Sequence, residues 1–243
     1  MTKAWNAFMA RKSELCCNRY PLRARLKLFE ATVSKSALYG CETWTMTSAH
    51  RQVLRTTQRR MLRWVLGKGR KVLPGRAENS TDSSDSSEYS DSTNEEPGSE
   101  VEEAEENLLQ DGIEDFVSWI KRTTGAVEAE LQSAQIEDWV VQQRRAYWRW
   151  AGHITRRTDH RWTTRVWNWI PSGGLRDSGH PKKRWVDDLK AHADSCVDPL
   201  ERKRLHFMMR HCGQAVENGR GKFSVRRWRE WWSSSEAAFV KDS

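Results

Sequence analysis

The sequence predicts an all-α protein, built as irregular helical bundles that a long disordered acidic insert interrupts. Two observations predict this fold class. Outside one acidic stretch, the apolar residues recur at intervals of three and four, which is the spacing of one face of a helix. No run of alternating polar and apolar residues is long enough to predict a sheet.

Three segments differ in composition. Residues 1–72 form a first helical segment, residues 73–112 form an acidic insert rich in Ser and Glu, and residues 113–243 form a basic, Trp-rich helical extension. The insert has very few apolar residues and a single sign of charge. It therefore cannot bury enough surface to offset its chain entropy, and we expect it to be disordered.

Helices are expected at five places, each marked by an apolar face. The apolar residues of the first two are Leu22, Leu26, Phe29, Val33 and Ala37 between Pro21 and Gly40, and Leu54, Met61, Leu62 and Val65 between the capping residue Ser48 and Gly67. A short helix over 113–120 has Ile113, Phe116, Val117 and Ile120, and a longer one over 136–157 has Ile136, Val140, Gln143, Tyr147, Trp150 and Ile154. The last begins at Asp198, Pro199 and Glu201 and continues through Leu205, Met208, Cys212 and Val216.

The distribution of charge points to a polyanionic partner. Residues 77–120 contain 15 acids and no Lys or Arg, so the other residues hold all 41 basic side chains against 18 acids, a net charge of +23. Such a surface points first to the backbone of RNA or DNA and second to an anionic membrane surface, and we expect nucleic acid, not a membrane, as the partner. No stretch approaches the roughly 20 apolar residues that a membrane helix needs. Five cysteines, without a repeated CxxC, indicate reduced thiols and an intracellular protein, nuclear or cytoplasmic.

Basic residues at helical spacing are the expected contacts to nucleic acid. Like charges four residues apart repel each other, so such a row needs solvent screening or an anionic partner. A Trp beside them can stack on an unpaired base, although a solvated helix face with the Trp in the core is the alternative. The expected nucleic-acid-binding residues are Arg51, Arg55, Arg59 and Arg63 in one helix, Arg144, Arg145, Trp148, Arg149, Arg156 and Arg157 in another, and Lys182, Lys183 and Arg184 near a third.

The pair Asp187 and Asp188 raises the question of catalysis. Paired aspartates after Trp185 and Val186 look like the metal-binding corner of a nucleic-acid polymerase. Trp185, Leu189 and Cys196 instead continue at helical spacing, which places both aspartates in the first turn of a helix, where acids are favourable.

Other catalytic or metal sites have weak support in the sequence. A zinc site from Cys196, His206, His211 and Cys212 matches no standard ligand spacing. There is also no nucleophile elbow and no phosphate-binding glycine loop. We therefore expect no enzymatic activity, cofactor, metal or small-molecule substrate.

Several blocks together resemble the reverse transcriptases of non-LTR (LINE-type) retrotransposons. RLKLFEATVSKSALYGCETWTMT (25–47) and RTTQRRMLRWVLG (55–67) resemble the segment after the polymerase palm. DWVVQQRRAYWRWAGHITRR (138–157), RVWNWIP (165–171) and GHPKKRWVDDL (179–189) resemble the tail, in the family's order.

This resemblance implies a thumb and a helical C-terminal extension, which hold template RNA and primer DNA. The catalytic palm and fingers are not among the matched blocks, so a separate palm and fingers polypeptide is an implied partner. The acidic insert departs from the family pattern. Two alternatives therefore stay open. One is a protein-interaction module whose acidic tail is regulated by phosphorylation at Ser92, Thr93 or Ser99, and the other is the product of a decayed element.

Overall fold

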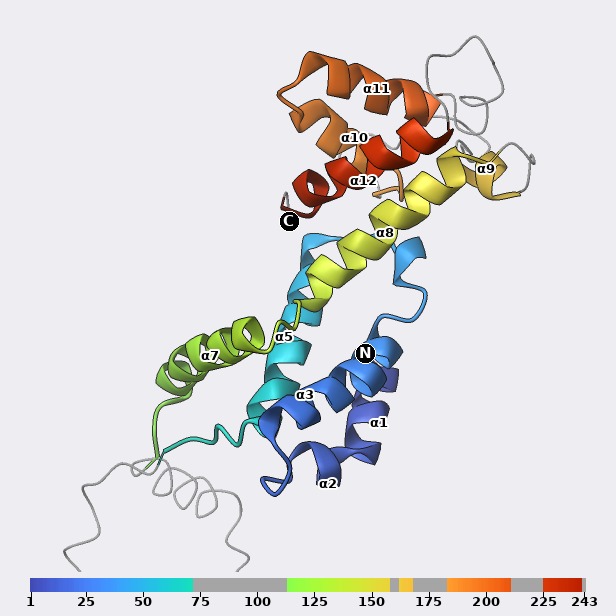
Figure 1. Ribbon diagram of the computed structural model, residues 1–243. Helices are drawn as coiled ribbons and strands as arrows, with labels where there is room; N and C mark the ends of the chain where they lie inside the picture. Colours follow the sequence, from blue (N-terminus) through green and yellow to red (C-terminus); the bar gives the residue numbers. More distant parts are fainter. Residues whose placement is uncertain (72–112, 158–161, 168–182, 211–224, 242–243) are drawn as a thin grey trace, which may run out of the picture.

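A computed structural model describes residues 1–71, 113–157, 162–167, 183–210 and 225–241 (Figure 1). Within these ranges the chain folds into helices and contains no strand, which confirms the all-α prediction. The acidic insert expected over 73–112 lies outside the described residues. In the described part of the chain, no helix has the length and apolar composition that crossing a membrane requires.

The N-terminal helices pack around α5. They are α1 (Thr2–Ala10), α2 (Lys12–Leu15), α3 (Leu22–Phe29), the π-helical turn η1 (Glu30–Ser34), α4 (Lys35–Ala37), the 3-10 turn η2 (Cys41–Thr43) and α5 (Ser48–Val65). The helix predicted over 21–40 is present as α3, η1 and α4 in succession, and it ends at Gly40 in the left-handed conformation, with φ of 67°. The start of α5 differs slightly from the prediction, because Thr47, not Ser48, accepts the capping hydrogen bond, from the backbone N–H of His50.

Three of the C-terminal helices were not predicted correctly from the spacing. The C-terminal helices are α7 (Phe116–Ser133), α8 (Trp139–Thr155), α9 (Trp162–Trp167), α10 (Asp187–Ser195), α11 (Pro199–Arg210) and α12 (Val225–Lys241). The short helix expected over 113–120 is wrong in its bounds and in its face, because α7 is 18 residues long and buries Thr123 and Val127. The residues expected on its apolar face, Ile113, Phe116 and Val117, are exposed. Helices α9 and α12 were not predicted at all. In α11, Leu205 and Met208 are buried as predicted, whereas Cys212 and Val216 lie outside the described residues.

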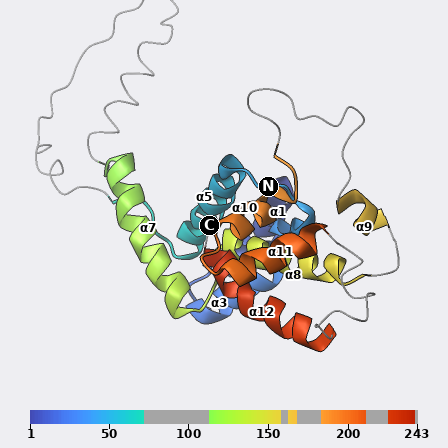
Figure 2. The same ribbon diagram turned by 90° about the horizontal axis from the view of Figure 1, so that it is seen from above.

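Helix α8 joins two hydrophobic cores. Its first residues, Trp139 and Val140, pack in the core of the N-terminal helices, and Tyr147, Trp148 and Ile154 pack in the core shared with α10, α11 and α12. Figure 1 shows α8 running from the N-terminal helices to the C-terminal ones, while α7 lies at the edge of the molecule beside α5 (Figures 1 and 2). The segments before and after the acidic insert therefore share one core.

The contact of α8 with α12 is very close. At Gly152, an added Cβ atom would lie 2.4 Å from Nε1 of Trp232. The Trp232 ring also stacks on Trp148, with 4.1 Å between ring centroids, and each indole N–H donates to the backbone carbonyl of the other residue at 2.9 Å. Glycine is needed here because any side chain would push the two helices apart.

Candidate nucleic-acid interface

The arginine row of α5 faces other parts of the same protein. Each arginine of the row contacts a different partner residue or pair, far away in the sequence. The contacts are Arg51 to Asp188 (3.3 Å), Arg55 to Asp138 (3.5 Å), Arg59 to Glu128 (2.7 Å), and Arg63 to the hydroxyls of Thr123 (2.9 Å) and Thr124 (2.8 Å). The repulsion expected along the row is thus offset within the molecule, and the row connects α5 to α7, to the start of α8 and to α10.

The basic residues of α8 contact α12 in a similar way. Arg145 pairs with Glu137 and with Glu236 (2.9 Å), and Arg149 pairs with Glu236 at 3.1 Å. Arg144 is buried and donates to the backbone carbonyl of Phe239. These side chains help to hold α12, and the Arg149 side chain, which is 66% exposed, is the most accessible of the three.

The two arginines at the end of α8 differ in their surroundings. Arg156 lies over the ring of Trp228, 5.0 Å from its centroid, and burial together with the nearby charge of Arg229 lowers its pKa. Arg157 is half-buried just after α8. Arg156 therefore also contributes to the contact with α12.

Trp148 belongs to the core. Its side chain has no exposed surface, and its ring stacks on Trp232 and Phe239. Both stacking partners come from α12, which the sequence did not predict. Because the ring packs against protein side chains and leaves no surface for a nucleobase, Trp148 does not stack on a base in this structure. The alternative, a Trp in the core, holds for this residue.

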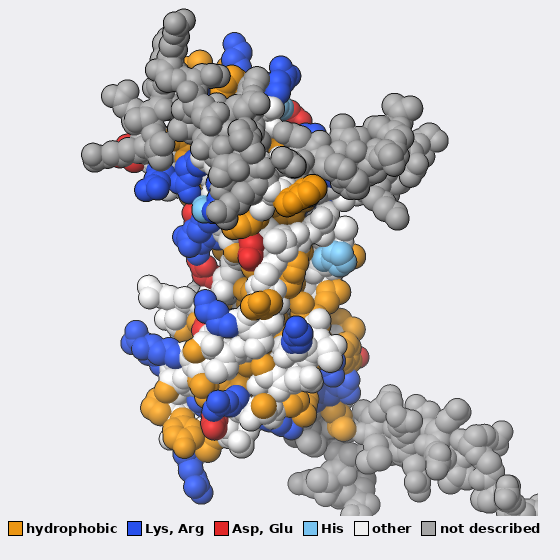
Figure 3. Space-filling view, turned by 90° about the vertical axis from the view of Figure 1, so that its right-hand side faces the viewer, with side chains coloured by type: hydrophobic (Ala, Val, Ile, Leu, Met, Phe, Trp, Pro, Cys, Tyr) orange, Lys and Arg blue, Asp and Glu red, His pale blue; other side chains and the backbone are white. Residues whose placement is uncertain are grey.

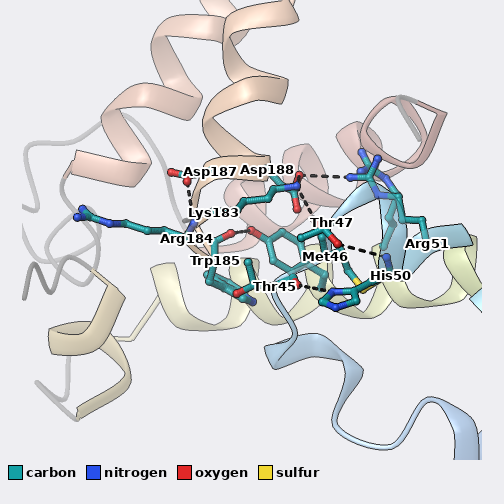
Figure 4. A network of polar contacts seen from close by, with 12 residues as sticks. Thr45, Met46, Thr47, His50, Arg51, Lys183, Arg184, Trp185, Asp187 and Asp188 are labelled. Atoms are coloured by element: carbon teal, nitrogen blue, oxygen red, sulfur yellow. Dashed lines mark hydrogen bonds and ion pairs between the residues drawn. The ribbon is translucent and has the colours of Figure 1, made fainter. Parts of the chain in front are cut away.

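The basic residues before α10 form a polar network with α5 (Figure 4). Lys183 Nζ lies 2.6 Å from Asp188 Oδ1 and donates to the backbone carbonyl of Met46, also at 2.6 Å. Asp188 therefore lies between the charges of Lys183 and Arg51. Arg184 is half-buried, and Lys182 lies outside the described residues.

Both aspartates lie in the first turn of α10, as the helical spacing predicted. Asp187 Oδ2 accepts a hydrogen bond from the backbone N–H of Arg184 at 2.8 Å, which ties the segment before α10 to the first turn of the helix. The indole N–H of Trp185 donates to the backbone carbonyl of Glu42 at 2.9 Å. The sequence WVDD thus fastens α10 to the N-terminal helices.

The described residues show no assembled metal site. Among them, no group of three or more His, Cys, Asp or Glu side chains lies close enough together to hold a metal ion. His206 Nε2 lies 2.9 Å from Asp194, and Cys196 Sγ lies 4.0 Å from Nε2 of His192. The other two residues considered for zinc, His211 and Cys212, lie outside the described ranges.

Among the residues that the structure describes, the most basic exposed surface is in the N-terminal segment. Residues 1–71 contain 16 Lys and Arg against three acids. Eleven of these basic side chains are exposed, and we call them the basic N-terminal surface: Lys3, Arg11, Lys12, Arg19, Arg23, Lys27, Lys35, Arg60, Lys68, Arg70 and Lys71. In the lower half of Figure 3, Lys and Arg side chains surround hydrophobic and uncharged atoms, with few acids between them.

Aromatic rings lie among these cations. Lys12 Nζ is 4.5 Å from the ring centroid of Trp64, which is 40% exposed, and Arg60 lies over Trp5 at 5.4 Å. Arg70 lies over Phe116, an exposed residue at the start of α7, at 5.2 Å. Alternating cations and aromatic rings are typical of surfaces that bind single-stranded nucleic acids. The sequence patterns missed this surface because its residues follow no single helical period.

A comparison with known proteins links part of the chain to a transposon. The chain is 46% identical over 41 residues to an uncharacterized transposon-derived protein of Caenorhabditis elegans. The match covers 17% of this chain and 15% of that protein. No protein-family model matches the chain, and no solved structure matches it. The short similarity supports a transposon origin.

Proposed function

We propose that this chain is a non-catalytic, nucleic-acid-binding part of a non-LTR retrotransposon reverse transcriptase, equivalent to its thumb and C-terminal extension. The ordered blocks that resemble this family support the proposal, and so does the short similarity to a transposon-derived protein. An all-helical fold around two connected cores is compatible with such a region. The chain acts with a separate palm and fingers polypeptide, in the nucleus or cytoplasm.

The observation that carries this proposal is the basic N-terminal surface. A segment with 16 basic residues and three acids repels itself unless counterions or a polyanion neutralise it. Acids from other segments pair with the α5 row, but the eleven exposed cations project from the surface. Phosphate groups of RNA or DNA would bind them and release counterions.

The arginine rows have a supporting role in this proposal. The arginine row holds α5, which carries Arg60 of the basic N-terminal surface, against α7, the start of α8 and α10. Arg145 and Arg149 already pair with Glu236, which offsets part of their charge, so they are secondary contacts.

The proposed absence of polymerase activity rests on the surroundings of the paired aspartates. Asp188 is held between Lys183 and Arg51, and Asp187 accepts a hydrogen bond from the backbone N–H of Arg184. We expect no primer extension by this chain with Mg²⁺ or Mn²⁺. Extension that disappears in Asp187→Asn would contradict the proposal.

The direct test is the salt dependence of binding to a labelled single-stranded RNA and a duplex DNA. We expect log K to fall linearly with log salt concentration, with a slope that corresponds to several phosphate contacts at about 0.7 to 0.9 each. Absence of binding, or binding that does not change with salt, would refute the proposal. Either result would favour the protein-interaction alternative.

A further inference from the structure

A groove on the basic N-terminal surface has cations on its rim and no acid in its lining. It lies between α1 and the helical segment formed by η1 and α4, and its volume is about 580 Å³. Lys3 and Arg11 line it from the α1 side, and Lys35 lines it from the opposite side. Small side chains, including Ala7 and Ala31, leave the space between them open.

A second groove differs from the first because acids are part of its lining. It has a volume of about 470 Å³ and is lined by Arg145, Arg149 and Lys35, but also by Glu30 and Glu137. There the cations already have acidic neighbours, as in the pair of Arg145 with Glu137. In the first groove, Arg11 pairs with Glu14 at 3.3 Å, but both side chains are about half exposed, and Glu14 is not part of the lining. Exposed pairs of this kind are weak, so a phosphate can replace Glu14.

One end of the first groove carries an exposed aromatic ring. Tyr39 is 79% exposed, which is a large apolar area to leave in water just before the turn at Gly40. Ser36 also lines the groove and adds a hydroxyl group, whereas the hydroxyl of Thr32 donates to the backbone carbonyl of Leu28 at 2.7 Å. Cations on two sides and an exposed ring at one end match the chemistry of a nucleotide strand, whose phosphates need cations and whose bases need a stacking surface.

We propose that this groove binds the backbone of a single-stranded RNA or DNA segment, with a base stacked on Tyr39. This inference rests on the proposed nucleic-acid-binding function and gives it a location. Lys3, Arg11 and Lys35 contact consecutive phosphates, and the alanines let the strand approach the helices closely. A duplex offers no unpaired base to Tyr39, so single strands bind here in preference.

The test uses the full chain and a fluorescent oligouridine, with binding followed by anisotropy at several salt concentrations. In the groove variant, Lys3, Arg11 and Lys35 are changed to Gln. In the control variant, the exposed Lys121, Lys190 and Lys203, on α7, α10 and α11, are changed to Gln, so both variants lose three positive charges. We expect the groove variant to have a slope flatter by about two units, which corresponds to about 100-fold weaker binding at 0.1 M salt. The control variant should change the slope much less.

Tyr39 supplies the second arm of the test. Tyr39→Ala should weaken binding of the single strand by about 5-fold to 150-fold, and Tyr39→Phe should retain it, because a phenyl ring also stacks. Thermal denaturation should show both variants as stable as the unchanged protein, since the ring is exposed.

The outcomes separate the groove from the general function. If the unchanged protein binds no oligouridine, the proposed function fails and the groove fails with it. If it binds but the groove and control variants lose affinity equally, the function stands and the groove assignment is overturned. If Tyr39→Ala binds as tightly as the unchanged protein, or if duplex DNA responds to the groove variant as strongly as the single strand, the single-strand assignment is overturned.

Discussion

Replacing Trp148 with Ala should damage the fold rather than nucleic-acid binding alone. The side chain is completely buried between Trp232 and Phe239, and its indole N–H donates to the backbone carbonyl of Trp232. The substitution opens a cavity the size of an indole ring and removes that hydrogen bond. Large-to-small changes of a buried Trp cost about 3–5 kcal/mol in the free energy of unfolding.

This cost translates into a large change of melting temperature. For a chain of this size, 1 kcal/mol corresponds to roughly 2–4 °C, so the loss should be about 6–20 °C by calorimetry or circular dichroism. Trp162, which is 75% exposed, provides the matched control, and Trp162→Ala should cost less than about 0.5 kcal/mol. A Trp148→Ala protein that melts like the unchanged one but binds single strands more weakly would refute the burial of Trp148.

Three further predictions concern α10, α8 and the N-terminal core. Asp188→Asn should cost about 1–3 kcal/mol in unfolding experiments, because Lys183 and Arg51 lose a shared acid. Asp187→Asn keeps an oxygen that can accept from the backbone N–H of Arg184 and should cost less than about 0.5 kcal/mol; equal costs would contradict this. Gly152→Ala should destabilise the protein by about 1–3 kcal/mol through contact with Trp232, while Gly125→Ala, in open space within α7, should stabilise it by up to about 1 kcal/mol. Burial, and then the charge of Glu42, raise the pKa of Cys41 from 9.0 to about 11. The neutral Cys41 thiol should therefore contribute fully to the free energy of unfolding below pH 9, and this contribution should be lost as the pH rises towards 11. Iodoacetamide should label Cys41 at pH 8 only after unfolding.

Helix positions were predictable from the sequence where one apolar face is continuous. This holds for α5 and α8, whose buried residues Leu54, Met61, Val140 and Tyr147 follow helical spacing. It failed for α12, where Trp228, Trp232 and Phe239 have helical spacing but Ser235 interrupts the apolar face. The prediction failed for α7 because the polar residue Thr123 lies on the buried face. Its hydroxyl accepts a hydrogen bond from Arg63 and donates one to the backbone carbonyl of Trp119 in its own helix.

The role of the arginine rows could not be read from local spacing. The repeat of Arg51, Arg55 and Arg59 predicted solvent screening or an anionic partner, and nucleic acid was the partner expected; in the structure the three arginines pair with acidic side chains. Those partners are Asp188, Asp138 and Glu128, which lie 69 or more residues away in the chain. Only the tertiary fold shows that the acids belong to the protein itself.

Binding of nucleic acid to the basic N-terminal surface can be measured by lysine acylation with and without a saturating single-stranded RNA, followed by mass spectrometry. We expect acylation of Lys3, Lys12 and Lys35 to slow when RNA is bound, because phosphates cover the basic N-terminal surface. Lys190 and Lys203, which are exposed on α10 and α11, should react at the same rate in both samples. Protection of Lys190 and Lys203 with unchanged reactivity of the three N-terminal lysines would contradict this expectation.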